Sequence, residues 1–117
     1  MLREFSSANV YLVCGYTDMR RGMDGLTAIV KQNYGMEPCS GELFLFCGRR
    51  RDRLKALLWE GDGFLLLYKR LDNGAFRWPR NSEEIRSLTP EQFTWLMQGL
   101  DIEQPKAIRK IQHKDLL

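Results

Sequence analysis

Residues 41–80 alternate short apolar runs with turn signals, and this alternation limits the possible folds more than any other feature of the sequence. The runs have the length of strands, are rich in aromatic and aliphatic residues and show no helical period. They are Leu43–Cys47, Leu54–Trp59, Phe64–Leu71 and Ala75–Trp78. Two of the connectors contain Asp62-Gly63 and Asn73-Gly74, dipeptides that suit hairpin turns. The segment therefore predicts an antiparallel meander.

One further strand and an amphipathic helix are predicted before the meander. Val10–Cys14 is β-rich and nearly continuous in apolar character, as expected of a strand covered on both faces. Asp24 is the predicted N-cap of a helix that ends at Gly35. The apolar residues on one side of this helix are Leu26, Ile29, Val30 and Tyr34.

A second helix is predicted after the meander. Thr89 is its N-cap, Pro90 takes its first position and Gln92 completes a capping box. Its apolar face consists of Phe93, Leu96, Met97 and Leu100. The preceding segment has two interpretations, a short helix capped by residues 82–84 or a brief extended stretch over Ile85–Leu88.

These elements predict an α+β fold in which a sheet of four to five antiparallel strands buries one face beneath the two helices. A half-open barrel is the structural alternative. The run Phe64–Leu71 is apolar on both of its faces. Either helices cover both faces there, or one face meets a partner or a second copy of the chain, and in the last case the chain is a homo-oligomer.

The length of 117 residues favours one domain, which we place at residues 1–104, followed by a basic tail at residues 105–117. The tail is either a short helix or mobile. No apolar run approaches the ~20 residues that span a bilayer, and the N-terminus lacks the layout of a signal peptide. We therefore expect a cytoplasmic protein without a membrane partner.

The three cysteines indicate reduced thiols rather than a disulfide or a metal site. Cys14, Cys39 and Cys47 are odd in number and form no C-x-x-C pair. Cys14 and Cys47 fall in apolar runs and are expected in the core. With His113 as the single histidine, the ligands for zinc are missing, and we expect no metal or other cofactor.

Positive charge is concentrated in the meander. Residues 41–80 hold nine basic and five acidic groups, whereas the whole chain has a net charge of +3. Four of the basic groups, Arg49, Arg50, Arg51 and Arg53, lie in or next to one connector. Guanidinium groups on a turn can bind phosphate oxygens in a bidentate manner, so this turn is a candidate nucleic-acid site. The alternative is a solvated turn that limits aggregation.

Further basic residues adjoin the arginine turn and complete the candidate nucleic-acid site. They are Lys55, Lys69, Arg70, Arg77 and Arg80. Trp59, Tyr68 and Trp78 lie among them, and aromatic rings beside cations are typical of single-stranded nucleic-acid binding. These aromatic residues could equally belong to the core.

The loop at residues 17–25 is the other polar concentration, with Asp18, Arg20, Arg21 and Asp24 as candidate residues for a structural loop or a partner contact. The structural interpretation pairs Asp18 with an arginine of the turn and assigns Asp24 to the helix cap.

Two pairs of carboxylates raise the alternative of a metal-dependent nuclease. Glu60 with Asp62, or Asp18 with Asp24, could hold divalent ions, but no third carboxylate adjoins either pair. The sequence also has no Gly-rich phosphate loop and no nucleophile motif. We therefore expect no catalytic residues and no enzyme activity.

Turn, aromatic and basic positions at fixed spacing also carry a family resemblance, which covers residues 10–101. They include Thr17-Asp18-Met19-Arg20, Gly48-Arg49-Arg50, Asp52-Arg53-Leu54-Lys55, Tyr68-Lys69-Arg70-Leu71, Trp78-Pro79-Arg80 and Leu88-Thr89-Pro90. In these positions the chain resembles the TnpB-type accessory proteins of bacterial insertion sequences of the insertion sequence sixty-six family.

This resemblance implies a helper in DNA transposition that acts with a separately encoded transposase, which carries the catalytic site. Together with the basic turn, it favours an accessory protein that binds element DNA. The alternative is a protein-interaction module that docks the transposase, or a second copy, without touching DNA.

Overall fold

The computed structural model describes residues 9–80, 84–105 and 108. The strands are β1 (Val10–Val13), β2 (Leu43–Cys47), β3 (Arg53–Trp59), β4 (Phe64–Arg70) and β5 (Ile85–Leu88). The helices are α2 (Met23–Ala28), which continues into the π-helical turn η1 (Ile29–Asn33), the short η2 (Pro38–Ser40) and α3 (Pro90–Met97). The predicted α+β fold, with a mostly antiparallel sheet and two helices, is confirmed.

The five strands form one open sheet in the order β4-β3-β2-β1-β5. β2, β3 and β4 pair antiparallel in chain order, as the meander predicted. β1 pairs with β2 in parallel, with Val10 opposite Leu43, and with β5 antiparallel. The expectation of a purely antiparallel sheet was wrong because the chain crosses through α2 between β1 and β2, and such a crossover permits parallel pairing. The sheet is not closed into the half-open barrel that was the alternative.

Residues 75–78, predicted as the fourth strand of the meander, form no strand. The backbone N–H of Phe76 donates to the carbonyl of Arg51 at 2.7 Å, and the indole N–H of Trp78 donates to the carbonyl of Val13 at 2.9 Å. The side chains of Phe76 and Trp78 are buried, so this apolar run packs into the core without pairing as a strand of the sheet. The extended alternative for Ile85–Leu88 is confirmed as β5. The helical alternative relies on residues 81–83, which lie outside the described residues.

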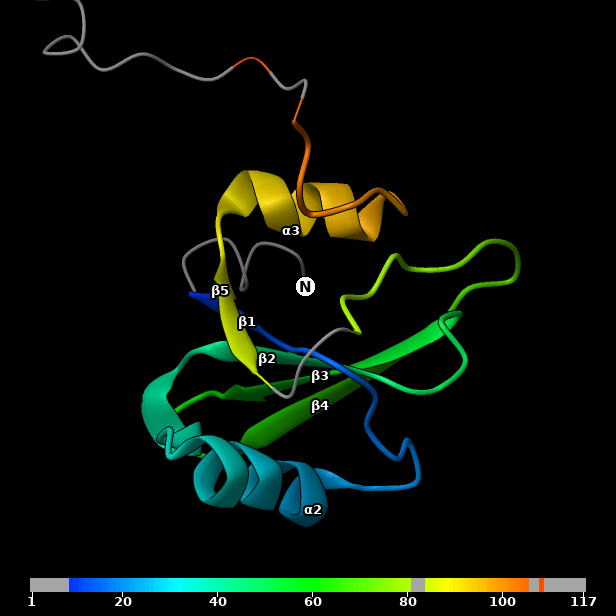
Figure 1. Cartoon of the computed structure of the whole chain (residues 1–117). Coiled ribbons are helices and arrows are strands. Elements are labelled where there is room, and N and C mark those ends of the chain that lie inside the picture. The colour runs from blue at the N-terminus through cyan, green and yellow to red at the C-terminus, as the bar shows by residue number, and fades with distance from the viewer. Residues whose placement is uncertain (1–8, 81–83, 106–107, 109–117) are drawn as a thin grey trace, which may run out of the picture.

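Helices cover both faces of the sheet, with α2 and η1 on one side and α3 on the other (Figure 1). Leu26 and Val30 pack with Phe44 and Phe46, whereas Leu96 belongs to a separate cluster on the opposite face. The expectation that both helices share one face was wrong, and the alternative that helices cover both faces is confirmed. All five residues of β2 are buried, and because successive side chains alternate in direction, each face of the sheet needs its own cover.

The two helix starts differ in how well the sequence predicted them. The capping box of α3 is confirmed, since Thr89 Oγ1 accepts from the backbone of Gln92 at 3.1 Å and Gln92 Oε1 accepts from the backbone of Thr89 at 3.0 Å. Asp24 does not cap α2, because that helix begins earlier and has Gly22 as its N-cap. Asp24 lies in the first turn, where its charge favours the helix dipole.

Cys14 and Cys47 are buried and Cys39 is exposed, and all three thiols are free, as predicted. Within the described residues, no helix is long and apolar enough to cross a membrane. The predicted tail consists mainly of residues 106–107 and 109–117, which lie outside the described residues, so the division at residue 105 stays a prediction.

Candidate nucleic-acid interface

The parallel pairing of β1 and β2 brings the segments that follow them to the same edge of the sheet. The backbone N–H of Thr17, after β1, donates to the carbonyl of Cys47, the last residue of β2, at 2.8 Å. The loop 14–22 therefore adjoins the turn 48–52. We call the surface formed by residues 14–22, 48–53, 55, 68, 70 and 80 the basic edge. Basic side chains outnumber its two carboxylates, Asp18 and Asp52.

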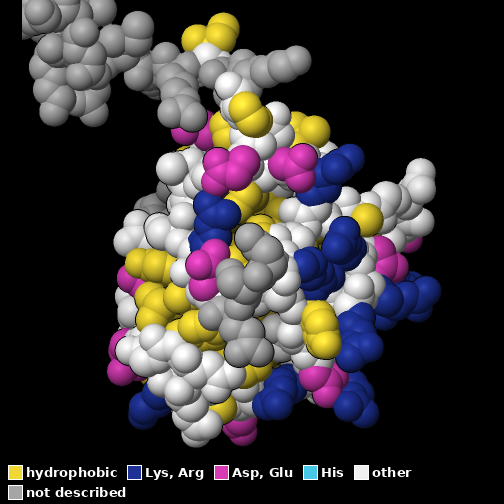
Figure 2. Space-filling model, in the orientation of Figure 1, with side chains coloured by type: hydrophobic (Ala, Val, Ile, Leu, Met, Phe, Trp, Pro, Cys, Tyr) yellow, Lys and Arg dark blue, Asp and Glu magenta, His cyan; other side chains and the backbone are white. Residues whose placement is uncertain are grey.

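The turn between β2 and β3 exposes three of the predicted arginines. Arg49, Arg50 and Arg51 are exposed, and within the described part of the chain none of them forms a salt bridge. Arg49 Nη2 donates to the hydroxyl of Tyr16 at 3.1 Å, and its guanidinium lies 4.7 Å from the centre of that ring. Figure 2 shows Lys and Arg side chains gathered on this side of the molecule, over the β2–β3 turn and the segment after β4.

Register pairs place Arg53, Lys55 and Arg70 on the face of the sheet that α2 covers. Arg53 lies opposite Arg70, and Lys55 lies opposite Tyr68. Arg53 Nε donates to Asp52 at 3.0 Å, an ion pair that raises the pKa of the guanidinium and lowers the pKa of the carboxyl. Lys55 Nζ donates to the carbonyl of Arg21 at 2.8 Å. Arg53 and Lys55 therefore use part of their hydrogen-bonding capacity on partners within the chain.

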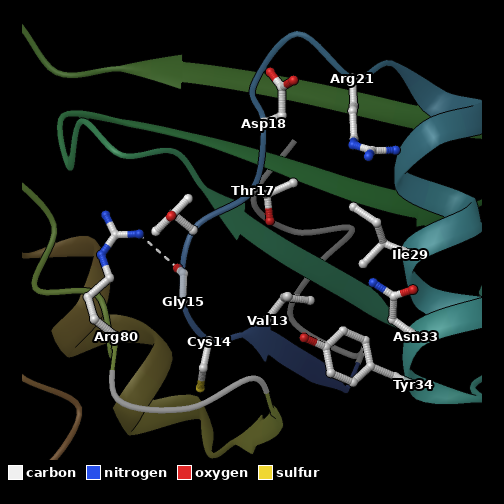
Figure 3. Close-up of a pocket in the computed structure, with 11 residues that line it drawn as sticks. Val13, Cys14, Gly15, Thr17, Asp18, Arg21, Ile29, Asn33, Tyr34 and Arg80 are labelled. Carbon is white, nitrogen blue, oxygen red and sulfur yellow. Dashed lines mark hydrogen bonds between the residues drawn. The ribbon is translucent and has the colours of Figure 1, made fainter.

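Three other predicted cations have different positions. Lys69 lies opposite Leu54 and so belongs to the face that α3 covers. Arg77 lies 3.9 Å from Asp101 in an exposed ion pair. Arg80 donates to the carbonyl of Gly15 at 2.8 Å (Figure 3) and to the carbonyl of Gly48 at 2.6 Å. The structure thus does not bring Lys69 and Arg77 to the arginine turn. Arg80 instead links the loop 14–22 to the turn 48–52.

Asp18 pairs with Arg20 instead of an arginine of the turn. Arg20 Nη2 donates to Asp18 Oδ2 at 2.8 Å and Arg20 Nε donates to Oδ1 at 3.0 Å. These hydrogen bonds hold the pKa of the Asp18 carboxyl well below its usual range. The predicted pairing was wrong because a partner two residues away is reached without ordering a second loop. Arg21 is exposed, and its backbone N–H donates to the carbonyl of Asp18 at 3.1 Å.

Two hollows flank the loop 14–22. The first, which we call the arginine pocket, has a volume of about 680 Å³. It is lined by Tyr16, Thr17, Asp18, Met19, Arg20, Gly48, Arg49, Arg50, Arg53 and Tyr68. The second is a cleft of about 760 Å³, lined by Val13, Cys14, Arg80, Ile29, Asn33 and Tyr34 among others. Figure 3 shows Val13 directed toward the helix residues of this cleft.

The aromatic residues of the candidate site divide between core and surface. Trp78 is buried, and Trp59 packs edge-on against Phe64 with 5.0 Å between ring centres. Tyr68 is 52% exposed and lines the arginine pocket. Sequence reasoning missed Tyr16, which is 58% exposed in the same pocket. Its contact with Arg49 spans 33 residues, so no local pattern could have shown it.

The carboxylates of the nuclease alternative lie apart. Asp18 belongs to the basic edge, next to the start of β3, whereas Glu60 and Asp62 belong to the turn at the far end of β3. Across the described residues, no three His, Cys, Asp or Glu side chains form a group that could hold a metal ion.

The match to the family described as IS66 Orf2 like protein covers residues 8–107. This chain belongs to that family. IS66 Orf2-like proteins are accessory proteins of transposition, so membership implies an association with the transposition machinery of an IS66 element. The earlier resemblance to insertion sequence sixty-six proteins is thereby confirmed.

Two relatives of this IS66 Orf2-like protein come from Sinorhizobium fredii (strain NBRC 101917 / NGR234). Uncharacterized protein y4hO is 35% identical over 106 residues, which cover 91% of this chain and 92% of the relative. Uncharacterized protein y4jC is 39% identical over 84 residues, or 72% of each chain. No solved structure matches this chain.

Proposed function

We propose that this IS66 Orf2-like protein is a non-catalytic accessory protein that binds element DNA through its basic edge, alongside a separately encoded transposase. One observation carries the proposal: three consecutive residues of one turn, Arg49, Arg50 and Arg51, are exposed and form no salt bridge among the described residues. Exposed guanidinium groups gathered on one surface attract a polyanion and bind its phosphates.

The distribution of carboxylates supports this proposal. Asp18 and Asp52 each bond to a neighbouring arginine, Arg20 and Arg53. Neither carboxylate forms a salt bridge with Arg49, Arg50 or Arg51. Among the described residues, no three His, Cys, Asp or Glu side chains form a group that could hold a metal ion, which also favours a non-catalytic role because metal-dependent phosphoryl transfer needs its carboxylates around one site.

The test measures binding of a labelled DNA fragment from the element end to the wild type and to the triple variant Arg49→Ala, Arg50→Ala, Arg51→Ala. Each lost phosphate contact should reduce the slope of log affinity against log salt by about 0.9. We expect the triple variant to bind at least roughly tenfold more weakly, with a slope shallower by about 2–3.

The control for this experiment is Lys31→Ala, which removes an exposed cation of η1 outside the basic edge. It should leave affinity and salt slope close to those of the wild type. Equal affinity and slope in the wild type and the triple variant would rule out DNA binding by the arginine turn.

A protein-docking module is the second candidate function, and the edge strand β4 favours it. β4 pairs only with β3 among the described strands, and its residues Leu65, Leu66 and Leu67 are only partly buried. Elution size of the protein alone and with the transposase, at low and high salt, separates the candidates. An apolar interface persists at high salt, whereas binding through phosphate contacts is lost.

A further inference from the structure

The arginine pocket contains the exposed aromatic rings of the molecule. Within the described residues, Tyr16 and Tyr68 are the two aromatic side chains that are exposed, at 58% and 52%. They come from positions 52 residues apart, yet both line this pocket. Neither belongs to the two hydrophobic clusters of the core. Core packing therefore does not explain why two large rings lie together on a charged surface.

Cations hold both rings in place. The guanidinium of Arg49 lies 4.7 Å from the centre of the Tyr16 ring, and that of Arg80 lies 5.9 Å from it. The ammonium of Lys55 lies 5.9 Å from the centre of the Tyr68 ring. Contacts of this kind restrict the rings without burying them, so less conformational freedom is lost when a ligand stacks on them.

The sheet order separates the backbone positions of the two tyrosines. Tyr68 is on β4 and Tyr16 follows β1, and β3 and β2 lie between these strands. Three strand spacings correspond to roughly 14 Å. Backbone positions this far apart suit two separate bases of an extended strand, one on each ring. Arg49, Arg50 and Arg53 line the same pocket, where their guanidinium groups can bind the phosphates that connect the bases.

From this arrangement, we propose that the arginine pocket binds single-stranded DNA, with one unpaired base stacked on Tyr16 and another on Tyr68. The proposal rests on the proposed DNA-binding function and specifies its substrate. Bases within a duplex are already stacked on one another and present no free face to a tyrosine. The protein should therefore bind single strands more tightly than duplex DNA of the same sequence.

The experiment compares a single-stranded oligonucleotide with its duplex, at one salt concentration, for the wild type and the double variant Tyr16→Leu, Tyr68→Leu. Leucine keeps apolar bulk but has no π face. Stacking of one base is worth about 1–3 kcal/mol, so loss of both rings should weaken single-strand binding by roughly tenfold or more. Duplex binding should change by less than about twofold, since the arginines remain.

The matched control is the double variant Tyr16→Phe, Tyr68→Phe, which keeps both rings and should retain the preference for single strands. Its unfolding curve and that of the leucine variant should coincide with the wild type, because both side chains are exposed.

Three results would overturn the inference. The first is equal wild-type affinity for single strands and duplex, and the second is unchanged single-strand binding in the leucine variant. In both cases, loss of binding in the Arg49→Ala, Arg50→Ala, Arg51→Ala variant would leave the proposed function standing. The third is a wild type that binds neither form, which would remove the proposed function as well.

Discussion

Arg80 differs from the other arginines of the basic edge because its partners are backbone carbonyls. It joins Gly15, after β1, to Gly48, after β2, and its side chain is only partly exposed. Gly48 itself permits a close approach, since a Cβ atom there would lie 2.6 Å from Met19 Cγ. The basic edge thus contains one arginine that stabilises the loops and several that face solvent.

The variant Arg80→Ala should lower the free energy of unfolding by about 2–3 kcal/mol, because hydrogen bonds from a charged donor to two carbonyls are lost. Arg50→Ala removes the same side chain from an exposed position and should change stability by less than about 0.5 kcal/mol. Denaturant titration monitored by tryptophan fluorescence measures both. Equal stability of the two variants would contradict the structural role of Arg80.

Thiol labelling should distinguish the three cysteines. Burial raises the pKa of the Cys14 and Cys47 thiols, whereas Cys39 is exposed. Because the thiolate is the reactive form, a small alkylating reagent should modify one thiol in the native protein and three after denaturation. Mass spectrometry counts the labels. Rapid labelling of more than one native thiol would show that the buried cysteines are accessible.

The same raised pKa values give a direction for the pH dependence of stability. Above the ordinary thiol value of 9.0, Cys14 and Cys47 of the unfolded chain ionise while the folded chain still holds their protons. The unfolded state then binds fewer protons than the native state, so these thiols lower stability as the pH rises. Replacing both by Ser should reduce the alkaline loss of stability seen in denaturant titrations, whatever its effect at neutral pH.

At the scale of elements, α3 shows how a local signal fixes a helix boundary. Its capping box satisfies backbone donors that have no partner within the helix. Leu96 then anchors the helix to the core. α2 has no side-chain cap, and packing of Leu26 and Val30 against β2 accounts for its position.

Thr89→Ala should cost about 1 kcal/mol of stability through loss of the capping hydrogen bond. Thr94 in the same helix is exposed, and its hydroxyl donates to the carbonyl of Pro90. The helix does not need this side-chain hydrogen bond in order to form. Thr94→Ala is therefore a matched control and should be neutral or slightly stabilising, since alanine is the better helix former. Thermal unfolding of the two variants compares them. If the melting curves of Thr89→Ala and Thr94→Ala coincide, the capping hydrogen bond of Thr89 does not stabilise the protein.

The sequence predicted the elements whose signals are local. Hairpin dipeptides and strand-length runs located β2, β3 and β4, and the capping box located α3. The parallel partner of β1 was missed because pairing between residues 10 and 43 leaves no local pattern. Residues 75–78 were misassigned because an apolar run can fill a core as well as a strand.

For the candidate site too, the sequence predicted the local feature but not the long-range contacts. The arginine turn is evident from composition, and its exposure agrees with a turn between antiparallel strands. Which cations share a surface depends on register and topology, so the positions of Lys69, Arg77 and Arg80 and the role of Tyr16 needed the structure.

At the scale of the whole molecule, the predicted domain ends at residue 104. Ile102 is buried, whereas Ile108 is fully exposed. A chain that ends at Gln104 is expected to keep the fold, with a melting temperature within about 2 °C of the full chain. Differential scanning calorimetry tests this prediction of the domain boundary. A large drop in melting temperature would place the later residues in the domain.

The position of β1 has a consequence for synthesis on the ribosome. β1 emerges first, but its two neighbours in the sheet begin at residues 43 and 85. Until the second of these has been translated, β1 has a free row of backbone donors and acceptors. Chains terminated before residue 85 should accordingly be prone to aggregate or to be degraded, because both neighbours of β1 are present only once β5 has been translated.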